Sequence, residues 1–476
     1  MTTTSDRLRG PSLPLLACLL FTACASPPPA QPPADTVPPQ WQAALPHGGE
    51  AAQLAGWWAR FDDPLLAQLI DTAQRRNPTL AQAAARIAQA RASVRIAGAA
   101  ARPTLAANVG AQRSDNDLPG TTGLQTAGSA TLDAAWEIDL FGATRQAVAA
   151  AQARADGADA QWHNARVSLA AEVAGAYVGL RSCEAVLEVY ENDARSGGQT
   201  ASLTQQKVDA GFEAPANAGL ARAAAAEAAN RVVAQRADCD LSVKQLAALT
   251  VEAEPVLRGL LAERRARLPQ PASFAVEAVP AQVLAQRPDV AAAEREIAAA
   301  SADVGAAHAD RFPRLSLTGS IGRAGVRVGG DTFDGRTWSF GPALLAPLVD
   351  GGRRVAAVDA AQGRYDEAVA GWRERVLAAA REVEEALVRL EAAQRREQDA
   401  QRAASGYAEF LAAAQTQWQV GTGSLLDLEQ ARRSSLGADA ALIQVRRERV
   451  AAWLALYKAV GGGWQQAAAG TTGDSN

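Results

Sequence analysis

The sequence of 476 residues has few of the side chains that usually perform catalysis. It contains four cysteines, one methionine and three histidines, His47, His163 and His308, which are far apart and have no metal-ligand spacing. With so few histidines most nucleophilic or acid–base schemes lack a base, and no paired-carboxylate arrangement is present either. We therefore expect no catalytic residues, no metal site and no cofactor, and we predict that the chain is not an enzyme.

A strong charge of one sign and abundant aromatic residues are also missing. The net charge is −4, which leaves no basic footprint for binding nucleic acid. Aromatic residues make up only 5% of the chain, and alanine dominates the 48% that is apolar. Alanine-rich sequence with scattered arginine, glutamate and glutamine is typical of long helices that pack closely on one another.

Long apolar runs are absent as well. The apolar stretch Leu13–Phe21 follows Arg7 and Arg9 and is too short to span a bilayer, which is typical of a targeting segment. Small residues before Cys24 resemble a bacterial lipobox and predict cleavage before Cys24 and its acylation. A competing match at Cys18 and an ordinary secretory signal are the alternatives. The Pro-rich stretch after Cys24 favours the lipoprotein, because it is a stiff spacer between an anchor and a fold.

An offset of 210 residues relates the two halves of the chain. The segment "RNPTLAQAAARIAQARASV" at Arg76 resembles "QRPDVAAAEREIAAASADV" at Gln286. One register over most of the chain is difficult to obtain by chance, so we predict two copies of one unit. The matched positions that keep this offset are Pro78 and Pro288, Pro103 and Pro313, Trp162 and Trp372, Glu172 and Glu382, Leu180 and Leu390, and Gly211 and Gly421.

Each copy begins with a helix and two strands. The helices, Thr79–Ala101 and Asp289–Asp310, end just before Arg-Pro or Phe-Pro, because residues that precede proline avoid the helical conformation. Apolar residues then occupy alternate positions, which predicts strands with one apolar face. These alternating stretches are Leu105–Ala111, Leu132–Leu140, Leu315–Ile321 and Trp338–Leu348.

A very long helical stretch follows the strands in each copy. Residues 143–209 and 353–420 contain no proline. A helix of ~67 residues would extend roughly 100 Å. Gly197 and Gly198 mark a possible interruption in the first copy. Helices of this length predict a coiled-coil-like tube or rod rather than a globular core.

Gly211 lies between a long helix and a returning helix, so it marks the tip of a hairpin. Cys183 lies 28 residues before Gly211, and Cys239 lies 28 residues after it. In an antiparallel hairpin the two cysteines would face each other, and a lipoprotein signal places them in an oxidising compartment. We predict a Cys183–Cys239 disulfide, with two buried thiols as the alternative. The second copy has Ala393 and Arg449 at these places, so the fold does not require the bridge.

Four strands with one apolar face cannot close a sheet within a single chain. No other stretch is long and apolar enough for a transmembrane helix, so a chain of this kind that spans a membrane must do so as a β-barrel. About eight strands is the smallest common closed size, and open edges are not tolerated in lipid. Two chains would enclose a filled interior, whereas three would leave a water-filled lumen. A pore joined to a helical conduit is a channel.

Several motifs together resemble one known family. They are "GWWARFDDPLLAQLIDTAQRRNPTL", "ARPTLAANVG", "WEIDLFG", "QRPDVAAAEREIAAASADVGAAHADRFPRLSLTGSIG", "PLVDGGRR" and "VGTGSLLDLEQARRSSL". In their order and coverage of nearly the whole chain they resemble the TolC-like outer-membrane efflux family, in its OprM/NodT-like lipoprotein branch. The resemblance implies a mixed α and β fold, mostly α. It further implies a homotrimer with a 12-stranded outer-membrane β-barrel, four strands per chain, and a long periplasmic α-helical barrel.

The same resemblance implies partners and an organisation. The partners would be a periplasmic adaptor (membrane fusion protein) and an inner-membrane pump, commonly proton-driven, for which the channel is a passive conduit for small molecules. A belt near the middle of the helical barrel would contain the N- and C-terminal segments and the connector. The expected segments are a signal peptide (1–23), a Pro-rich linker (24–40), an N-terminal equatorial segment (41–78), repeat 1 (79–250), an equatorial connector (251–280), repeat 2 (281–462) and a flexible tail (463–476).

The resemblance also places the functional site at the hairpin tips, which would close the channel and meet the adaptor. Leu426 and Asp427 match positions near the family's constriction, where an apolar ring and an acidic ring narrow the pore. Gly423 stands where one branch has a basic residue, and Gln430 stands where members often have Asp. The tip residues are Val208, Gly211, Phe212, Val420, Gly421, Thr422, Gly423 and Ser424. The remaining candidates for tip ion pairs are Asp427, Glu429, Arg432 and Arg433, with a solvated helix face as the alternative for the last three.

Two competing functions fit the sequence less well. The stretch "VGTGS" at Val420 could cradle phosphate in a nucleotide-hydrolysing enzyme, but it lacks the GK[ST] ending and follows a helix rather than a strand. A scaffolding lipoprotein with a helical rod and no pore would not need four amphipathic strands. The motifs do not select a cargo, so drugs, metal ions, lipids and siderophores all stay candidates.

Overall fold

The computed structural model describes residues 39–43, 45, 50–51, 54–116, 123–271, 273–276, 280–328 and 330–464. The predicted signal peptide, the lipidation site Cys24, most of the Pro-rich linker and nearly all of the predicted tail lie outside these described residues.

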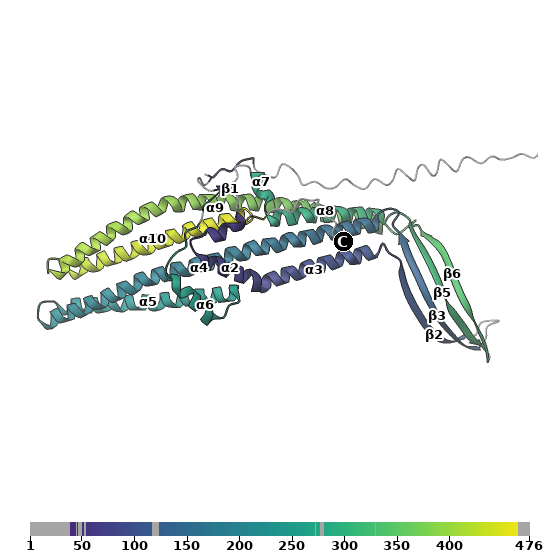
Figure 1. Ribbon diagram of the computed structural model, residues 1–476, viewed down its shortest axis with the longest axis horizontal. Coiled ribbons are helices and arrows are strands. Elements are labelled where there is room, and N and C mark those ends of the chain that lie inside the picture. The colour runs from purple at the N-terminus through teal and green to yellow at the C-terminus, as the bar shows by residue number, and fades with distance from the viewer. Residues whose placement is uncertain are drawn as a thin grey trace, which may run out of the picture. The chain divides into compact units, whose positions relative to one another are not determined.

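Two successive sets of elements follow one plan of helix, two strands, long helix and returning helix (Figure 1). This is the order that the sequence repeat predicts for each copy. The first set is α3 (Pro78–Ala99), β2 (Thr104–Asn116), β3 (Gly123–Ile138), α4 (Ala143–Asp209) and α5 (Pro215–Thr250). The second set is α8 (Pro288–Ala309), β5 (Arg314–Val328), β6 (Asp331–Leu345), α9 (Arg353–Gln419) and α10 (Leu425–Ala459).

Helix α4 runs without a break through Gly197 and Gly198, so the predicted interruption is wrong. A glycine inside a helix costs about 1 kcal/mol relative to alanine, and tertiary packing commonly outweighs this cost. A methyl group on Gly197 would lie 3.7 Å from the Cα atom of Ala225 in α5. This is an ordinary van der Waals distance, so Gly197 lies at the contact between α4 and α5 but is not required there for space.

Two shorter segments flank the first set. The N-terminal segment pairs with the connector, because β1 and β4 form a parallel two-stranded sheet in which Glu50 lies opposite Phe274. The segment before α3 contains β1 (Glu50–Ala51), the 3₁₀ helix η2 (Leu54–Arg60) and α2 (Pro64–Arg76). The connector after α5 contains α6 (Glu254–Leu261), the 3₁₀ helix η3 (Ala262–Arg264), β4 (Phe274–Ala275) and α7 (Pro280–Ala285).

The chain forms two compact units. One unit contains residues 88–156 and 294–371, which include all four long strands. The other contains the described parts of residues 33–87, 157–293 and 372–476 and is helical apart from β1 and β4. Helices α3, α4, α8 and α9 contribute residues to both units. No helix within the described ranges combines the length and the apolar composition that crossing a membrane requires.

The four long strands form one antiparallel sheet with the order β2-β3-β5-β6. Thr104 lies opposite Ala135 in the first strand hairpin, and Arg314 lies opposite Leu345 in the second. Each of these partners is displaced by the same 210 positions, so the sequence repeat is also a repeat of strand register. Among the described residues β2 and β6 are the two edge strands.

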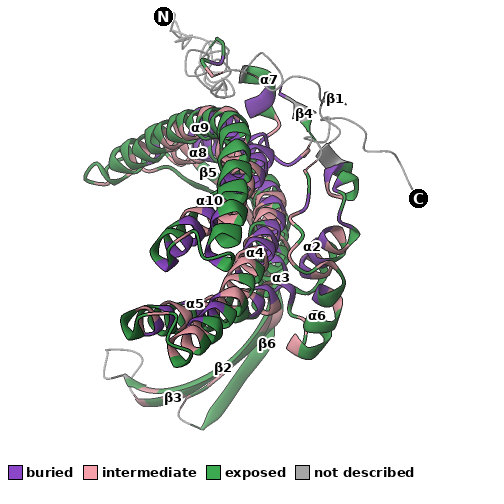
Figure 2. Cartoon of the chain, turned by 90° about the vertical axis from the view of Figure 1, so that its left-hand side faces the viewer, coloured by how far each residue is buried: buried purple, intermediate pink, exposed green. Residues whose placement is uncertain are grey.

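One surface of this sheet, which we call the apolar face, carries the alternating apolar residues. Ile321 lies opposite both Leu132 and Trp338, and directly opposed residues of antiparallel strands point to the same side. No strand residue with a described side chain is buried in the single chain (Figure 2). The apolar face includes Leu105, Val109, Leu132, Trp136, Leu315, Leu317, Ile321, Trp338, Phe340 and Leu344. The opposite face includes Thr104, Asn108, Thr131, Asp133, Thr318, Ser320, Thr337 and Ser339.

A hydrophobic core lies in the helical unit. Leu66 and Leu69 of α2, Leu180 of α4, Leu246 of α5 and Leu257 of α6 are nearly inaccessible to solvent. Both α2 and α6 contact α5. The N-terminal segment and the connector are thus attached to the first helical hairpin by buried leucine side chains.

Polar groups buried beside this core make specific hydrogen bonds, although Nε and Nη2 of Arg181 have no partner among the described residues. The Tyr177 hydroxyl donates a hydrogen bond to Asp63 at 2.7 Å, and Asp63 also accepts from the backbone N–H of Leu65 at 3.2 Å as the cap of α2. Burial and the bond to Asp63 raise the pKa of the Tyr177 phenol. The fully buried Arg181 donates to the carbonyl of Leu261 at 2.9 Å, and its guanidinium lies 4.8 Å from the centre of the Tyr177 ring. These contacts fix the start of α2 and the end of α6 against α4.

One tether occurs in both sets at matched positions. Asn77 donates a hydrogen bond to the carbonyl oxygen of Leu249 at 2.8 Å, and Arg287 donates to that of Ala459 at 2.8 Å. Both donors directly precede the first helix of their set, α3 or α8, and both acceptors lie at the end of a returning helix. Arg287 also binds Asp289 with an N–O distance of 2.7 Å, so the second tether carries a charge pair that the first one lacks.

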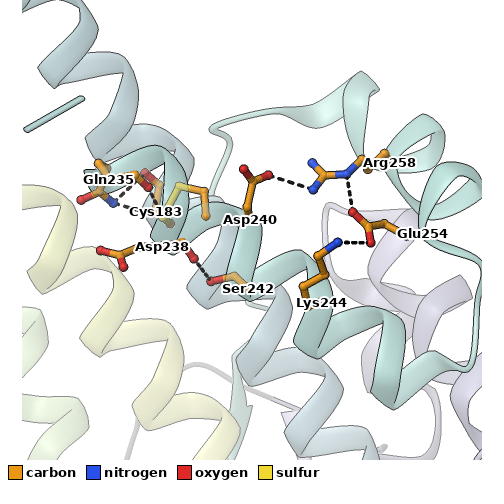
Figure 3. Close-up of polar contacts among 9 residues, drawn as sticks. Cys183, Gln235, Asp238, Asp240, Ser242, Lys244, Glu254 and Arg258 are labelled. Atoms are coloured by element: carbon orange, nitrogen blue, oxygen red, sulfur yellow. Dashed lines mark hydrogen bonds and ion pairs between the residues drawn. A yellow bond between two sulfur atoms is a disulfide. The ribbon is translucent and has the colours of Figure 1, made fainter. Parts of the chain in front are cut away.

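The first helical hairpin contains a disulfide between Cys183 of α4 and Cys239 of α5, with the Cα atoms 5.5 Å apart (Figure 3). This is the pair that the spacing about Gly211 predicts. Next to it, the side-chain amide of Gln235 donates to the carbonyl oxygen of Cys183 at 3.3 Å. Asp240, the residue after Cys239, binds Arg258 of α6 at 2.8 Å and holds the connector to the hairpin (Figure 3).

Candidate functional site at the hairpin tips

The first long helix ends in a glycine turn. Gly211 has φ of 79°, in the left-handed region that favours glycine. The N–H of Phe212 donates to the carbonyl of Lys207 at 2.8 Å, and the N–H of Gly211 donates to that of Val208 at 2.9 Å. This pair of bonds is a Schellman motif, which satisfies the last carbonyls of the helix.

The second long helix ends in the same way. Gly421 has φ of 80°. The N–H of Thr422 donates to the carbonyl of Gln417 at 2.9 Å, and the N–H of Gly421 donates to that of Trp418 at 3.3 Å. The two predicted tip glycines therefore have one structural role, which is to end a helix and reverse the chain. The "VGTGS" stretch forms a turn between two helices.

The returning helices begin differently. Helix α5 starts at Pro215 without a side-chain cap, whereas α10 starts with a capping box between Ser424 and Asp427. The Ser424 hydroxyl accepts from the N–H of Asp427 at 3.1 Å, and the Asp427 carboxylate accepts from the N–H of Ser424 at 3.3 Å. Asp427 thus stabilises the first turn of α10. Sequence reasoning predicted Asp427 as a constriction residue and did not predict this capping role. The S-x-x-D spacing was the available signal.

Apolar side chains at the tips face solvent in the single chain. The exposed fractions are 84% for Phe212, 69% for Val420 and 68% for Leu426. Large apolar groups gathered at an exposed turn are typical of a surface that binds another protein. Gly423 is half-buried, and a Cβ atom there would lie 3.0 Å from the Cβ of Gln417. This crowding disfavours a basic side chain at Gly423 in the observed turn.

A buried cluster joins the two tips. Trp418 of α9 packs with Ala221 of α5 and with Leu425 and Leu428 of α10, and all four are almost completely buried. The ammonium group of Lys207 lies 4.5 Å from the centre of the Trp418 ring, a cation–π contact between the two hairpins. Sequence reasoning did not single out Trp418, although a bulky aromatic residue three positions before the turn glycine was a visible signal.

An ion cluster lies further from the turn. Arg432 of α10 is 7% exposed and donates to Glu429 at 2.5 Å, to Ser196 at 3.1 Å and to Thr200 at 3.0 Å. Its Nε atom lies 3.8 Å from a carboxylate oxygen of Asp193 on α4. The solvated-face alternative is therefore wrong for Glu429 and Arg432. These two residues connect α10 to α4 within one chain.

The neighbouring Arg433 points to solvent, as a residue on a hydrated helix face does. The cluster of Arg432 is extended on its other side, where Asp193 also accepts from Arg231 of α5 at 2.8 Å. Three helices of the two hairpins thus meet around Asp193. Within the described ranges no group of three or more histidine, cysteine or carboxylate side chains could hold a metal ion.

Comparison with known proteins identifies the family to which this architecture belongs. Residues 69–251 and 279–462 match the family described as "Outer membrane efflux protein", one match for each copy of the repeat. The outer membrane protein OprJ of Pseudomonas aeruginosa is 32% identical over 464 residues, which cover 95% of each chain. The pyoverdine export outer membrane protein OpmQ of the same organism is 30% identical over 94% of this chain and 96% of its own.

A solved structure agrees with these relatives. The open-state outer membrane channel MtrE of Neisseria gonorrhoeae superimposes with a TM-score of 0.77, at 28% identity, over 92% of this chain and 98% of its own. The matches extend over both strand hairpins and both helical hairpins, so they cover the tip region as well as the sheet. The chain belongs to the outer membrane efflux protein family, and it is an outer-membrane channel of an efflux system and not an enzyme.

Proposed function

We propose that three copies of this chain close their sheets into one twelve-stranded pore and that the joined helical hairpins continue it as a passive export duct. The observation that carries the proposal is the sheet itself, which has one apolar face and, among the described residues, two edge strands, β2 and β6, that are each paired on one side only. In lipid, unpaired backbone groups at an edge are very costly. Association with further copies removes both edges.

The strand register specifies how neighbouring copies should meet. Displacement by 210 residues maps the β2–β3 pairing onto the β5–β6 pairing. Ala134 of β3 lies opposite Gly319 of β5. Exchange of the two repeats adds 210 to Ala134, which gives Leu344, and subtracts 210 from Gly319, which gives Val109. It therefore places Leu344 of β6 opposite Val109 of β2 in the next copy. Both residues lie on the apolar face, so the predicted junction keeps the two faces of the sheet continuous.

Cysteine cross-linking tests this junction. In the variant Val109→Cys/Leu344→Cys, mild oxidation should produce a covalent trimer on a non-reducing gel. Ala106→Cys/Leu344→Cys is the matched control, because Ala106 points to the opposite face of the sheet, and it should stay monomeric. A wild-type channel that gives no conductance in a planar bilayer and migrates as a monomer without heating would contradict the duct and favour the scaffold.

The hairpin tips are the proposed docking surface for a periplasmic adaptor and an inner-membrane pump, which we take to be proton-driven. Support comes from the exposed apolar side chains of Phe212, Val420 and Leu426. Phe212→Asp/Val420→Asp should abolish co-purification with the adaptor, whereas Phe410→Asp, an exposed aromatic position on α9 away from the turn, should not. Leu426 and Asp427 are the proposed constriction, where three copies would converge on the pore axis.

Relatives of similar identity carry names that refer to different cargoes. At 28–30% identity these names mention pyoverdine export, toluene efflux and cation efflux. This diversity supports a permissive duct whose cargo is chosen by the pump. We also propose that Cys24 is acylated and anchors the mature chain to the outer membrane.

A further inference from the structure

The apolar face of the sheet changes character abruptly along its strands. On β5, apolar or small residues occupy the face from Leu315 to Ile321, and the next residue on that face is Arg323. On β6 the corresponding series runs from Leu344 to Trp338, and the next residue is Arg336. The apolar rows extend over about 20 Å at 3.4 Å per residue, close to the roughly 25 Å of a membrane-facing band.

Arg323 and Arg336 lie directly opposite each other in the strand pairing. Two like charges in this position repel each other and destabilise a sheet. Arg323 donates to Asp334 at 2.9 Å. Arg336 is exposed and has no hydrogen-bond or ion-pair partner among the described residues. A pair of adjacent guanidinium groups, one of them unpaired, is a suitable place for an external anion.

Further cationic groups occur on the same side of the sheet. Arg113 of β2 and Arg327 of β5 also lie on this face, beyond the apolar rows, and Asp115 and Asp334 are the acidic residues there. The balance at this border is therefore positive. The next row toward the strand turns contains Gly128 and Gly325, which lie opposite each other and carry no side chain.

The position along the strands identifies the anion. Helices α4 and α9 follow β3 and β6 at the apolar end, so the arginines lie at the end of the sheet nearest the strand turns. Under the proposed function the helices are periplasmic, and the arginine border then lies at the headgroups of the outer leaflet. In the Gram-negative outer membrane this leaflet consists of lipopolysaccharide, whose lipid A is a bisphosphorylated glycolipid.

We propose that Arg323 and Arg336, supported by Arg113 and Arg327, bind a phosphate group of lipid A. Guanidinium groups recognise phosphate by paired, charge-assisted hydrogen bonds. A phosphate between Arg323 and Arg336 also neutralises their mutual repulsion. The inference rests on the proposed function, because it needs this face of the sheet to contact the outer leaflet.

Titration of the purified channel in detergent with lipid A tests the site. Wild type should bind bisphosphorylated lipid A more tightly than phosphatase-treated lipid A. Arg323→Gln/Arg336→Gln should weaken the binding about twenty-fivefold, at about fivefold for each cationic group near a membrane surface. Arg314→Gln, which removes one charge from the opposite face of β5, should bind like wild type. Inorganic phosphate alone should not compete.

Several outcomes would overturn the proposal. Unchanged lipid A affinity in the double variant, or equal binding of inorganic phosphate, would remove the arginine border as a lipid site. If the double variant does not assemble, Arg336→Lys keeps the charge and should still weaken binding by several fold, because lysine cannot form the paired bonds. If wild type conducts but the double variant binds lipid A as tightly as wild type, only this site is refuted. If wild type gives no conductance, the duct itself is refuted.

Discussion

The two helical hairpins have nearly the same length and the same glycine turn, yet different chemistry joins their helices at one matched level. In the α4–α5 hairpin Cys183 is bonded to Cys239. In the α9–α10 hairpin the matched residues are Ala393 and Arg449. Arg449 lies 3.2 Å from the carboxylate of Glu397, so a partly exposed ion pair stands beside the position of the covalent bond.

The fold requires the two helical hairpins, whereas the disulfide is an addition found in the first copy alone. Both long helices end at a matched glycine, Gly211 or Gly421, although only the first hairpin has the disulfide, so the disulfide is not required to form a hairpin. The disulfide joins cysteines 56 residues apart. A closed loop of this size contributes about 4 kcal/mol in the chain-entropy treatment. A partly exposed ion pair contributes about 0–1 kcal/mol. The disulfide therefore adds more to the stability of the first hairpin than the ion pair adds to that of the second, which depends more on its contacts with the first.

The largest effect is expected where the second hairpin is held by the first. Arg432→Ala removes the bonds to Ser196 and Thr200 of α4 and leaves Glu429 buried without its cation. We expect the free energy of unfolding to fall by about 3–5 kcal/mol, because a buried charge that loses its partner is not resolvated. Urea unfolding of the purified channel, followed by circular dichroism, measures the loss.

The adjacent residue supplies the control. Arg433 is exposed, so Arg433→Ala should change the free energy of unfolding by about 0.5 kcal/mol or less. Equal losses in the two variants would show that the Arg432 cluster does not connect the hairpins energetically.

The disulfide should give the next largest effect. Cys183→Ala/Cys239→Ala is expected to lower the free energy of unfolding by about 2–4 kcal/mol, mainly because the unfolded chain regains freedom. Reductant should reproduce this loss in wild type and have no effect on the double alanine variant.

The same bond can be transferred to the second hairpin. Ala393→Cys/Arg449→Cys places cysteines at the matched level, and mass mapping should recover them as a disulfide. Two free thiols after oxidation would show that the hairpins differ in register at this level, contrary to the comparison.

Spacing symmetry accounts for what the sequence predicted. The turns at Gly211 and Gly421 and the pairing of Cys183 with Cys239 follow from positions counted along one hairpin, because antiparallel helices bring equidistant residues together. The strand faces follow from alternation in the same local way. These features need no knowledge of how the two hairpins pack on each other.

The features that sequence reasoning missed depend on that packing. Arg432 and Glu429 are buried where the first hairpin meets α10, and Arg432 donates to Thr200 of α4 there. Small alanine side chains dominate these helices, so no clear apolar stripe shows which face is covered. Trp418 and Lys207 are likewise far apart in sequence and meet across the two tips. Contacts between hairpins therefore could not be deduced from the pattern of either hairpin alone.

The matched tethers predict a difference in acid sensitivity. Burial opposes ionisation of Asp289, but the hydrogen bonds and charge of Arg287 outweigh it, so the pKa of Asp289 lies below its ordinary value. A lowered carboxyl pKa adds stability above the pKa of the unfolded chain, about 3.9. This contribution is lost as the pH falls through the folded-state pKa. The first tether, with Asn77 and Thr79, has no titrating group at these positions.

Exchanging the residues tests the difference. Arg287→Asn/Asp289→Thr gives the second tether the chemistry of the first, and its free energy of unfolding should fall less than that of wild type between pH 5 and pH 2. We expect this effect to be smaller than the loss of the disulfide, because only one of the two carboxylates that Arg287 binds, Asp289, is shielded from solvent, whereas Glu382 is exposed. Parallel acid titrations of the two proteins would contradict a role for Asp289.

The smallest effect is expected at the ends of the returning helices. Val251 has φ of 53° at the end of α5, and the matched Gly461 has φ of 87° beyond the end of α10. A β-branched residue in the left-handed region is strained, whereas glycine is not. At Gly461 a Cβ atom would lie 2.2 Å from the carbonyl oxygen of Gln286, so only the second copy needs glycine for space as well as for conformation.

Val251→Gly should therefore raise the free energy of unfolding by about 1 kcal/mol, as the relief of about 1–3 kcal/mol of backbone strain is partly offset by the greater freedom of glycine in the unfolded chain. Thermal unfolding measures the gain. Val251→Ala keeps a Cβ atom in the left-handed region and should gain less. Equal gains would mean that the branched side chain, rather than the backbone conformation, is the source of strain.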